Sequence, residues 1–339
     1  MHRHRHSRSE QRRMHRPGPV RIFCDSSIFP NLPVFLPIGE RVRYDPSWKV
    51  RCSPRQRQRE TTMKIAYSTY ALQTIDPLEA IERVRDIGYD GLELNVGDAW
   101  PTAASKLDVD ARKRLCEAFQ RAGFPSPVLM YLINLCSPEE DTSAKSAALA
   151  ASCQLAVDLS YDDRTPVVTT TLGSHGVEWA ECRDEVASRL RPYADIAADH
   201  GCIIAAEAHV GQEFNAPEKA VWLVETLDHD SVRLNYDQSH FHVLGMDLHH
   251  CAELCAPWSV HTHLKDGYKD EAGKVHFQLP GDGSLDLDDY FRTVSAVGLD
   301  LPITAEVSGQ IWNRPDYDPW STAQQCYKAM RGAVDRLSA

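Results

Sequence analysis

The chain has 339 residues, 42% hydrophobic and 25% charged, which is the composition of an ordinary globular protein with enough apolar material for a large core. It contains no run of about 18 apolar residues, so the sequence predicts no transmembrane helix and no membrane partner. The formal net charge is −11, and this charge is divided unevenly along the chain.

Residues 1–62 differ in kind from the rest. They hold 14 basic and 5 acidic residues, a balance of +9, whereas residues 63–339 hold 23 basic and 43 acidic residues, a balance of −20. The segment has no hydrophobic periodicity, and its apolar part, "FPNLPVFLPIGE", is too broken by Pro for a signal peptide. It is either a nucleic-acid-binding tail or transit peptide, or a disordered leader without a partner. We favour the disordered leader, and a start of translation at Met63 would explain it; the intact mass of the native protein would test that start.

Ten cysteines are scattered along the chain, and none forms a CxxC pair. This pattern predicts a reduced, cytoplasmic protein with buried thiols rather than a disulfide framework. Cys251 and Cys255 lie four residues apart on one face of a predicted helix, a spacing that favours packing over a zinc site.

From Met63 onward, β-rich apolar runs alternate with amphipathic runs. We predict strands at 64–70, 89–95, 126–134, 166–173, 202–210, 231–237, 259–266 and 301–308. We predict helices at 76–88, 108–123, 138–160, 179–201, 216–228, 247–258, 285–298 and 321–337. Pro77 in a first turn and the stops at Gly88, Gly123 and Gly201 are typical helix boundaries.

Strict alternation of strand and helix indicates a parallel sheet of the α/β class. Eight such units in about 277 residues predict a closed (β/α)₈ TIM barrel over residues 63–339. A doubly wound open sheet is the alternative. However, the first strand-to-helix turn, "STYALQTIDP", lacks the GxGxxG fingerprint, and the sequence contains no Walker A motif.

The chemistry of such a barrel lies at the carboxyl ends of its strands. Four neighbouring strands, the fifth to the eighth, each end in one metal-competent group: Glu207, Asp237, His263 and Glu306. The period of two puts Glu207 on the face of Ala205 and Glu306 on that of Thr304, so small neighbours leave room for a ligand. A carboxylate inside an apolar strand is costly unless it is paired or binds a metal. The pattern therefore predicts a metal site.

Three carboxylates and one imidazole favour a hard divalent ion, Mn²⁺ or Mg²⁺, with Co²⁺ as an alternative. Zn²⁺ would prefer more His or Cys ligands. His261 shares a face with His263 but lies deeper, where it would be a core histidine or one that orients a ligand. His175, in "LGSHGVEW" after the fourth strand, is either an ordinary rim residue or a substrate contact.

The barrel region resembles the xylose isomerase-like TIM-barrel superfamily of sugar isomerases and epimerases. The resemblance covers residues 63–339 and is carried by "GYDGLEL", "AAEAH", "DQSH", "HTHLKD", "LPGDGSLDLDDYFRTV" and "ITAEVS" in this order. It implies that the four strand-end groups bind one divalent ion, and that Glu207 and Glu306 also flank the substrate and move protons. It further implies that His240 contacts a substrate oxygen, with supporting roles for Lys265 and Asp266.

The implied reaction is metal-assisted proton transfer through an ene-diolate of a sugar or keto-sugar, giving epimerisation or isomerisation. If the enolate instead expels a β-hydroxyl, the same site is a dehydratase or lyase, as in the inosose dehydratase-like members of the superfamily. Dimers and tetramers are common among similar barrels, so a homo-oligomer is a further expectation.

An apurinic endonuclease would need further metal ligands on earlier strands. Here the second and third strands end in Asn95 and Asn134, and residues 267–284 contain no Asp-x-His. The acidic balance of the barrel also disfavours DNA, so we expect no nucleic-acid partner. A non-catalytic sugar-binding barrel, which would bind no divalent metal, is the remaining alternative.

Overall fold

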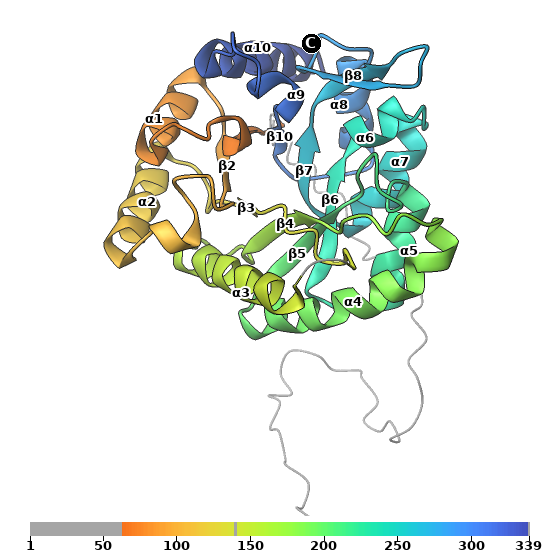
Figure 1. Cartoon of the computed structure of the whole chain (residues 1–339). Helices are drawn as coiled ribbons and strands as arrows, with labels where there is room; N and C mark the ends of the chain where they lie inside the picture. The colour runs from red at the N-terminus through yellow and green to blue at the C-terminus, as the bar shows by residue number, and fades with distance from the viewer. Residues whose placement is uncertain (1–62, 139–140, 338–339) are drawn as a thin grey trace, which may run out of the picture. The chain divides into compact units, whose positions relative to one another are not determined.

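A computed structural model describes residues 63–138 and 141–337, so the predicted leader, residues 1–62, lies outside the described residues. Eight parallel strands close into a barrel surrounded by helices (Figure 1). The barrel strands are β1 (Ile65–Ser68), β2 (Gly91–Asn95), β3 (Leu129–Met130), β4 (Val167–Thr171), β5 (Ile203–Glu207), β6 (Val232–Asp237), β7 (Ser259–Leu264) and β10 (Ile303–Ala305). Each falls within its predicted range, and the predicted TIM barrel is confirmed.

The helices around the barrel also match the predicted ranges. They are α1 (Pro77–Ile87), α2 (Val109–Ala122), α3 (Thr142–Asp158), α4 (Trp179–Asp199), α5 (Pro217–Leu227), α7 (Leu248–Cys255), α8 (Leu287–Ala296) and α10 (Pro319–Leu337). Helix α1 begins where the Asp76 side chain accepts hydrogen bonds from the amides of Leu78 and Glu79. It ends at Gly88, whose φ of 115° only glycine adopts readily.

Two short helices and one hairpin were not predicted. Helix α6 (Gln238–Val243) follows β6 directly, α9 (Gly309–Trp312) follows β10, and β8 (Asp266–Lys269) pairs with β9 (Val275–Gln278) in an antiparallel hairpin. The predicted seventh strand therefore runs too far, because Leu264 ends the barrel strand and Asp266 already belongs to the hairpin. The polar stretch that follows the seventh barrel strand is largely this hairpin.

The strand register brings the polar strand ends to one level. Glu207 pairs with Asn235 across β5 and β6, Asp237 with His263 across β6 and β7, and Thr304 with His263 across β10 and β7. Successive side chains point to opposite faces. On β6, Leu234 and Tyr236 thus join the apolar core, whereas Asn235 and Asp237 join the polar groups within the barrel.

None of the described helices is long and apolar enough to cross a membrane. The eight cysteines of the described residues are all free, and all but Cys116 are buried. This agrees with the prediction of small buried thiols.

Candidate metal centre and active site

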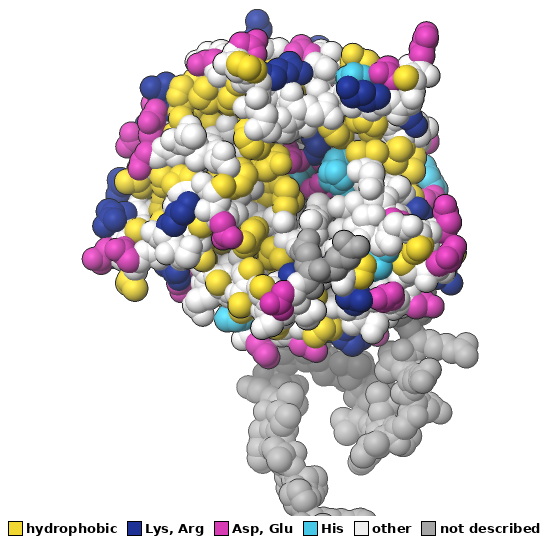
Figure 2. Space-filling view, viewed as in Figure 1, with side chains coloured by type: hydrophobic (Ala, Val, Ile, Leu, Met, Phe, Trp, Pro, Cys, Tyr) yellow, Lys and Arg dark blue, Asp and Glu magenta, His cyan; other side chains and the backbone are white. Residues whose placement is uncertain are grey.

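The four predicted ligand side chains meet at the carboxyl end of the barrel. Glu207, Asp237, His263 and Glu306 each offer one ligand atom, and these atoms all lie within 4.8 Å of one another. All four residues are buried, with at most 5% of their surface exposed. Figure 2 shows histidine, acidic and basic side chains gathered in a hollow at the centre of the barrel, with hydrophobic side chains around it. The four predicted side chains therefore converge in the fold, and metal binding by them stays a prediction.

The orientation of two of the carboxylates is explained by groups next to them in the fold. Asp237 ends β6 and caps α6, so its Oδ1 accepts a hydrogen bond from the Ser239 amide at 2.9 Å. Its other oxygen, Oδ2, remains for the cluster. The side-chain amide nitrogen of Asn235, Nδ2, donates a hydrogen bond to Glu207 Oε2 at 2.6 Å. One oxygen of each carboxylate is therefore held by the scaffold.

His263 lies between the glutamates. Its Nδ1 is 2.9 Å from Glu207 Oε2 and 3.3 Å from Glu306 Oε2. Burial alone would lower the pKa of His263, but Glu93 and Glu306 beside it raise that pKa well above its usual range. A metal ion at Nδ1 would take the place of a proton on that nitrogen.

Lys265, predicted as a substrate contact, lies between two of the predicted ligands. Its buried ammonium contacts Asp237 Oδ2 and Glu306 Oε2, and lies 5.6 Å from the ring centre of Phe277 on the hairpin. Burial would lower the pKa of Lys265, but the surrounding carboxylates, Asp237 and Glu306 foremost, raise it above its ordinary value. The ammonium therefore supplies positive charge to the same oxygens that a divalent ion would use.

His240, on α6, lies beside the cluster as the DxxH motif implied. Its Nε2 is 3.0 Å from Glu207 Oε1 and 3.4 Å from Asp237 Oδ2. The ring packs on His209 with centres 4.0 Å apart, and Phe277 meets it edge-on at 5.4 Å. Burial, and next the neighbouring His240, lower the pKa of His209 to about 4, so this second imidazole is neutral near pH 7.

Asp266 and His175 have other surroundings. The Asp266 carboxylate is buried and accepts hydrogen bonds from the amides of Gly267, Gly281 and Leu285, which hold the base of the hairpin. His175 lies in the loop after β4, and its backbone amide donates a hydrogen bond to the Glu213 carboxylate. The ring nitrogens of His175 have no hydrogen-bond partner among the described residues. The predicted contacts of both residues with substrate stay predictions.

An aromatic group borders the site on the side of β1 and β10. Tyr70 stacks on Trp100 with ring centres 5.6 Å apart and meets Trp312 edge-on at 5.4 Å. Burial, and next the charge of Glu306, raise the pKa of Tyr70. Only the fold shows that Tyr70 and Trp100 share one wall with Trp312.

Two further residues at the site were not predicted. Phe277 comes from a hairpin that the sequence did not reveal. Glu93 lies in β2, in the quoted motif "GYDGLEL", and is buried inside the barrel. The signal for Glu93 was present, since a carboxylate inside an apolar strand carries the same cost that singled out Glu207. Only the fold shows what it pairs with, because its partners come from β1 and β7.

Comparison with known proteins agrees with this geometry. A family model described as xylose isomerase-like TIM barrel matches residues 81–330. An inosose dehydratase of Geobacillus thermodenitrificans is 29% identical over 171 residues, which are 46% of this chain and 54% of that protein. An inosose isomerase of Bacillus velezensis is 22% identical over 288 residues, 81% of this chain and 97% of that one. The match to the first of these relatives spans only about half of its length.

Solved structures share the fold. The crystal structure of an IOLI protein with a bound zinc atom has a TM-score of 0.66 at 20% sequence identity, covering 81% of this chain and 99% of that one. At this identity the likeness shows the architecture alone. The family model, however, covers most of the chain, and the chain therefore belongs to the xylose isomerase-like TIM-barrel family.

Proposed function

We propose that the protein is a divalent-metal-dependent enzyme that moves a proton beside the carbonyl of a sugar or keto-polyol, as an isomerase or epimerase. The observation that carries the proposal is the convergence of three buried carboxylates and one imidazole at the carboxyl end of the barrel. The names of the relatives, inosose isomerase and inosose dehydratase, point to a cyclic keto-polyol as the substrate class.

The residues present fit a divalent ion. Three buried carboxylates face each other, and the ammonium of Lys265 and the rings of His240 and His263 each contact two of them. Glu207, Asp237, His263 and Glu306 would hold the ion, and the oxygen-rich donor set favours Mn²⁺ or Mg²⁺, with Co²⁺ or Zn²⁺ as alternatives. When bound, such an ion supplies a Lewis acid that acidifies the C–H beside a carbonyl.

The protein side chains would then transfer the proton. Glu207 ends β5 and Glu306 directly follows β10, with β6 and β7 between these strands in the barrel, so the two glutamates can flank a substrate. One carboxylate takes the proton, and the other, or the same one, returns it to the opposite face or the adjacent carbon. His240, beside Glu207, would hold a substrate oxygen. Phe277 packs over Lys265 and His240 and would help to exclude water.

A dehydratase is the second candidate. One of the relatives with 29% identity is an inosose dehydratase, and loss of a β-hydroxyl begins with the same proton abstraction. The two reactions share their first step at this site and differ in whether the proton returns or a hydroxyl leaves. The identity of the product separates them.

The test removes metal with a chelator and restores Mn²⁺, Mg²⁺, Co²⁺ or Zn²⁺ singly. Each form is incubated in D₂O with a panel of ketoses and inososes and followed by NMR. We expect deuterium to enter the carbon next to the carbonyl, only with metal, and not in Glu306→Gln. If no divalent ion binds and no exchange occurs, the proposal fails and a non-catalytic barrel is the better description.

A further inference from the structure

A second polar cluster lies deeper in the barrel, towards the amino ends of the strands. Its centre is the carboxylate of Glu93 on β2. The Nε2 atoms of His261 and His263 lie 2.7 and 2.8 Å from its Oε2, and the hydroxyl of Ser68 donates to its Oε1 at 2.5 Å. All four side chains are buried. His263 belongs to both clusters, since its other nitrogen faces Glu207 and Glu306.

We propose that Glu93 is a positioning residue for His263, which it holds with the ring proton on Nε2 and with Nδ1 turned to the metal site. The inference rests on the proposed metal-binding function. In a neutral imidazole, one ring nitrogen carries the proton and the other has a free lone pair. The hydrogen bond made by the nitrogen that does not bind the metal decides which of the two carries the proton. A carboxylate in that place fixes the tautomer and the ring orientation, and strengthens the ligand nitrogen.

The surroundings of Glu93 suit an acceptor. Ser68 donates to one oxygen, and the two imidazoles share the other, so three donors converge on one carboxylate. An ionised carboxylate accepts hydrogen bonds only, whereas an amide in its place would bring two N–H donors towards two imidazoles. Both Nε2 atoms of the histidines are therefore donors as long as Glu93 keeps its charge. His261 then acts on Glu93 and not on the metal directly.

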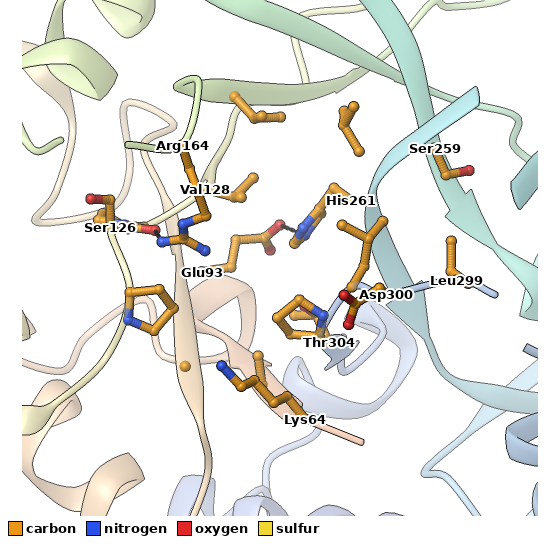
Figure 3. A pocket seen from close by; sticks show the side chains of 18 of the residues that line it. Lys64, Glu93, Ser126, Val128, Arg164, Ser259, His261, Leu299, Asp300 and Thr304 are labelled. Carbon is orange, nitrogen blue, oxygen red and sulfur yellow. Dashed lines mark hydrogen bonds and ion pairs between the residues drawn. The ribbon is translucent and has the colours of Figure 1, made fainter. Parts of the chain in front are cut away.

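A cavity of about 1020 Å³ reaches this second cluster from the amino end of the barrel. Its lining includes Glu93 and His261, and Figure 3 shows these two side chains joined by a hydrogen bond. The carboxylate of Glu93 thus lies between the metal cluster and the cavity. A small carboxylate such as formate could enter from this side and replace the Glu93 side chain once it is shortened.

Glu93, His261 and His263 are also close enough to hold a metal ion themselves. The hydrogen-bond distances favour protons over a metal in this place, because both Nε2 atoms already face the same carboxylate oxygen at 2.7 and 2.8 Å. A second ion would also force His263 to bridge two metals. The metal stoichiometry tests this alternative: two ions per chain, with one lost in His261→Gln, would overturn the positioning role.

The experiment compares chelator-treated full-length protein, Glu93→Gln, and the matched control Glu253→Gln, whose carboxylate is exposed on α7. Calorimetry with Mn²⁺ gives the affinity. We expect a 10- to 100-fold loss in Glu93→Gln, the range typical of carboxylates behind a histidine ligand, and no change in the control. Formate should restore affinity to Glu93→Ala. Equal Mn²⁺ affinity in the wild type and Glu93→Gln would overturn the inference.

A second measurement needs no variant of Glu93. In the ¹⁵N-histidine-labelled wild type loaded with Mg²⁺, the ¹⁵N shifts of His263, assigned with His263→Gln, report which nitrogen carries the proton. A proton on Nε2 supports the proposal, and a proton on Nδ1 overturns it even if every Glu93 variant fails to fold. A wild type that binds no divalent ion would instead overturn the proposed function, so the two failures are distinguishable.

Discussion

Buried carboxylates have different surroundings in the two polar clusters of the barrel. At the carboxyl end, Glu207, Asp237 and Glu306 share the ammonium of Lys265 and the imidazoles of His240 and His263. Deeper in the barrel, the single carboxylate of Glu93 receives three donors. The described cavity of about 1020 Å³ opens at the amino end, away from the convergent ligands. The convergence of three carboxylates, and not cavity size, therefore marks the place where a cation would bind.

The largest effect that this comparison predicts is at Glu207. Glu207→Gln keeps the shape of the side chain but removes both a metal ligand and a base. We expect the rate of metal-dependent deuterium exchange to fall by about 10²- to 10⁴-fold, the usual contribution of a positioned base. The exposed Glu253→Gln is the control and should keep its full rate. If Glu207→Gln exchanged at the wild-type rate, Glu207 would be neither ligand nor base.

Lys265→Met tests, through the free energy of unfolding, whether the ammonium and a divalent ion share the same carboxylate oxygens. The substitution leaves Asp237 and Glu306 buried without their ammonium, and breaking a buried pair in this way costs about 3–5 kcal/mol. A divalent ion on the same oxygens would compensate, so the loss should be largest in chelator and shrink in saturating Mg²⁺. Urea unfolding in both conditions measures this, with the exposed Lys113→Met as control. An equal loss with and without Mg²⁺ would show that the ammonium and the ion do not share these oxygens.

Much of this arrangement could be predicted from sequence. Each strand and helix of the barrel carries a local signal of periodicity, caps and stops, and once the barrel is assumed, its strand ends must converge. This logic located Glu207, Asp237, His263 and Glu306. It did not reveal the β8–β9 hairpin, because that polar segment is organised by tertiary hydrogen bonds from Gly281 and Leu285 to Asp266. The hydrogen-bond partners of Glu93 could not be predicted either, because they lie about 25 and 170 residues away along the chain.

Ser68→Ala tests whether the hydrogen bonds of Glu93 affect the metal site. It removes the donor to Glu93 Oε1 but leaves Oε2, the oxygen that faces His263. A lost hydrogen bond to a buried carboxylate should lower the free energy of unfolding by about 1–3 kcal/mol. We expect the Mn²⁺ affinity to change less than twofold. A large loss of affinity in this variant would mean that the whole carboxylate, and not its Oε2 alone, positions His263.

The smallest effect concerns the rim at the amino end, where Asp162 accepts from the Ser126 amide at 2.9 Å and pairs with Arg164 at 2.8 Å. Partial burial opposes ionisation, but these partners hold the pKa of Asp162 at about 2, below its ordinary value. The stabilisation is present above the unfolded-state pKa of about 3.9 and is lost as the pH falls through about 2. Asp162→Asn should therefore cost roughly 1 kcal/mol at pH 7, a value kept small by solvent exposure. The difference in unfolding free energy from the wild type should be constant above pH 5 and shrink between pH 4 and 2. A difference that did not change over this range would show that Asp162 stabilises the rim without its charge.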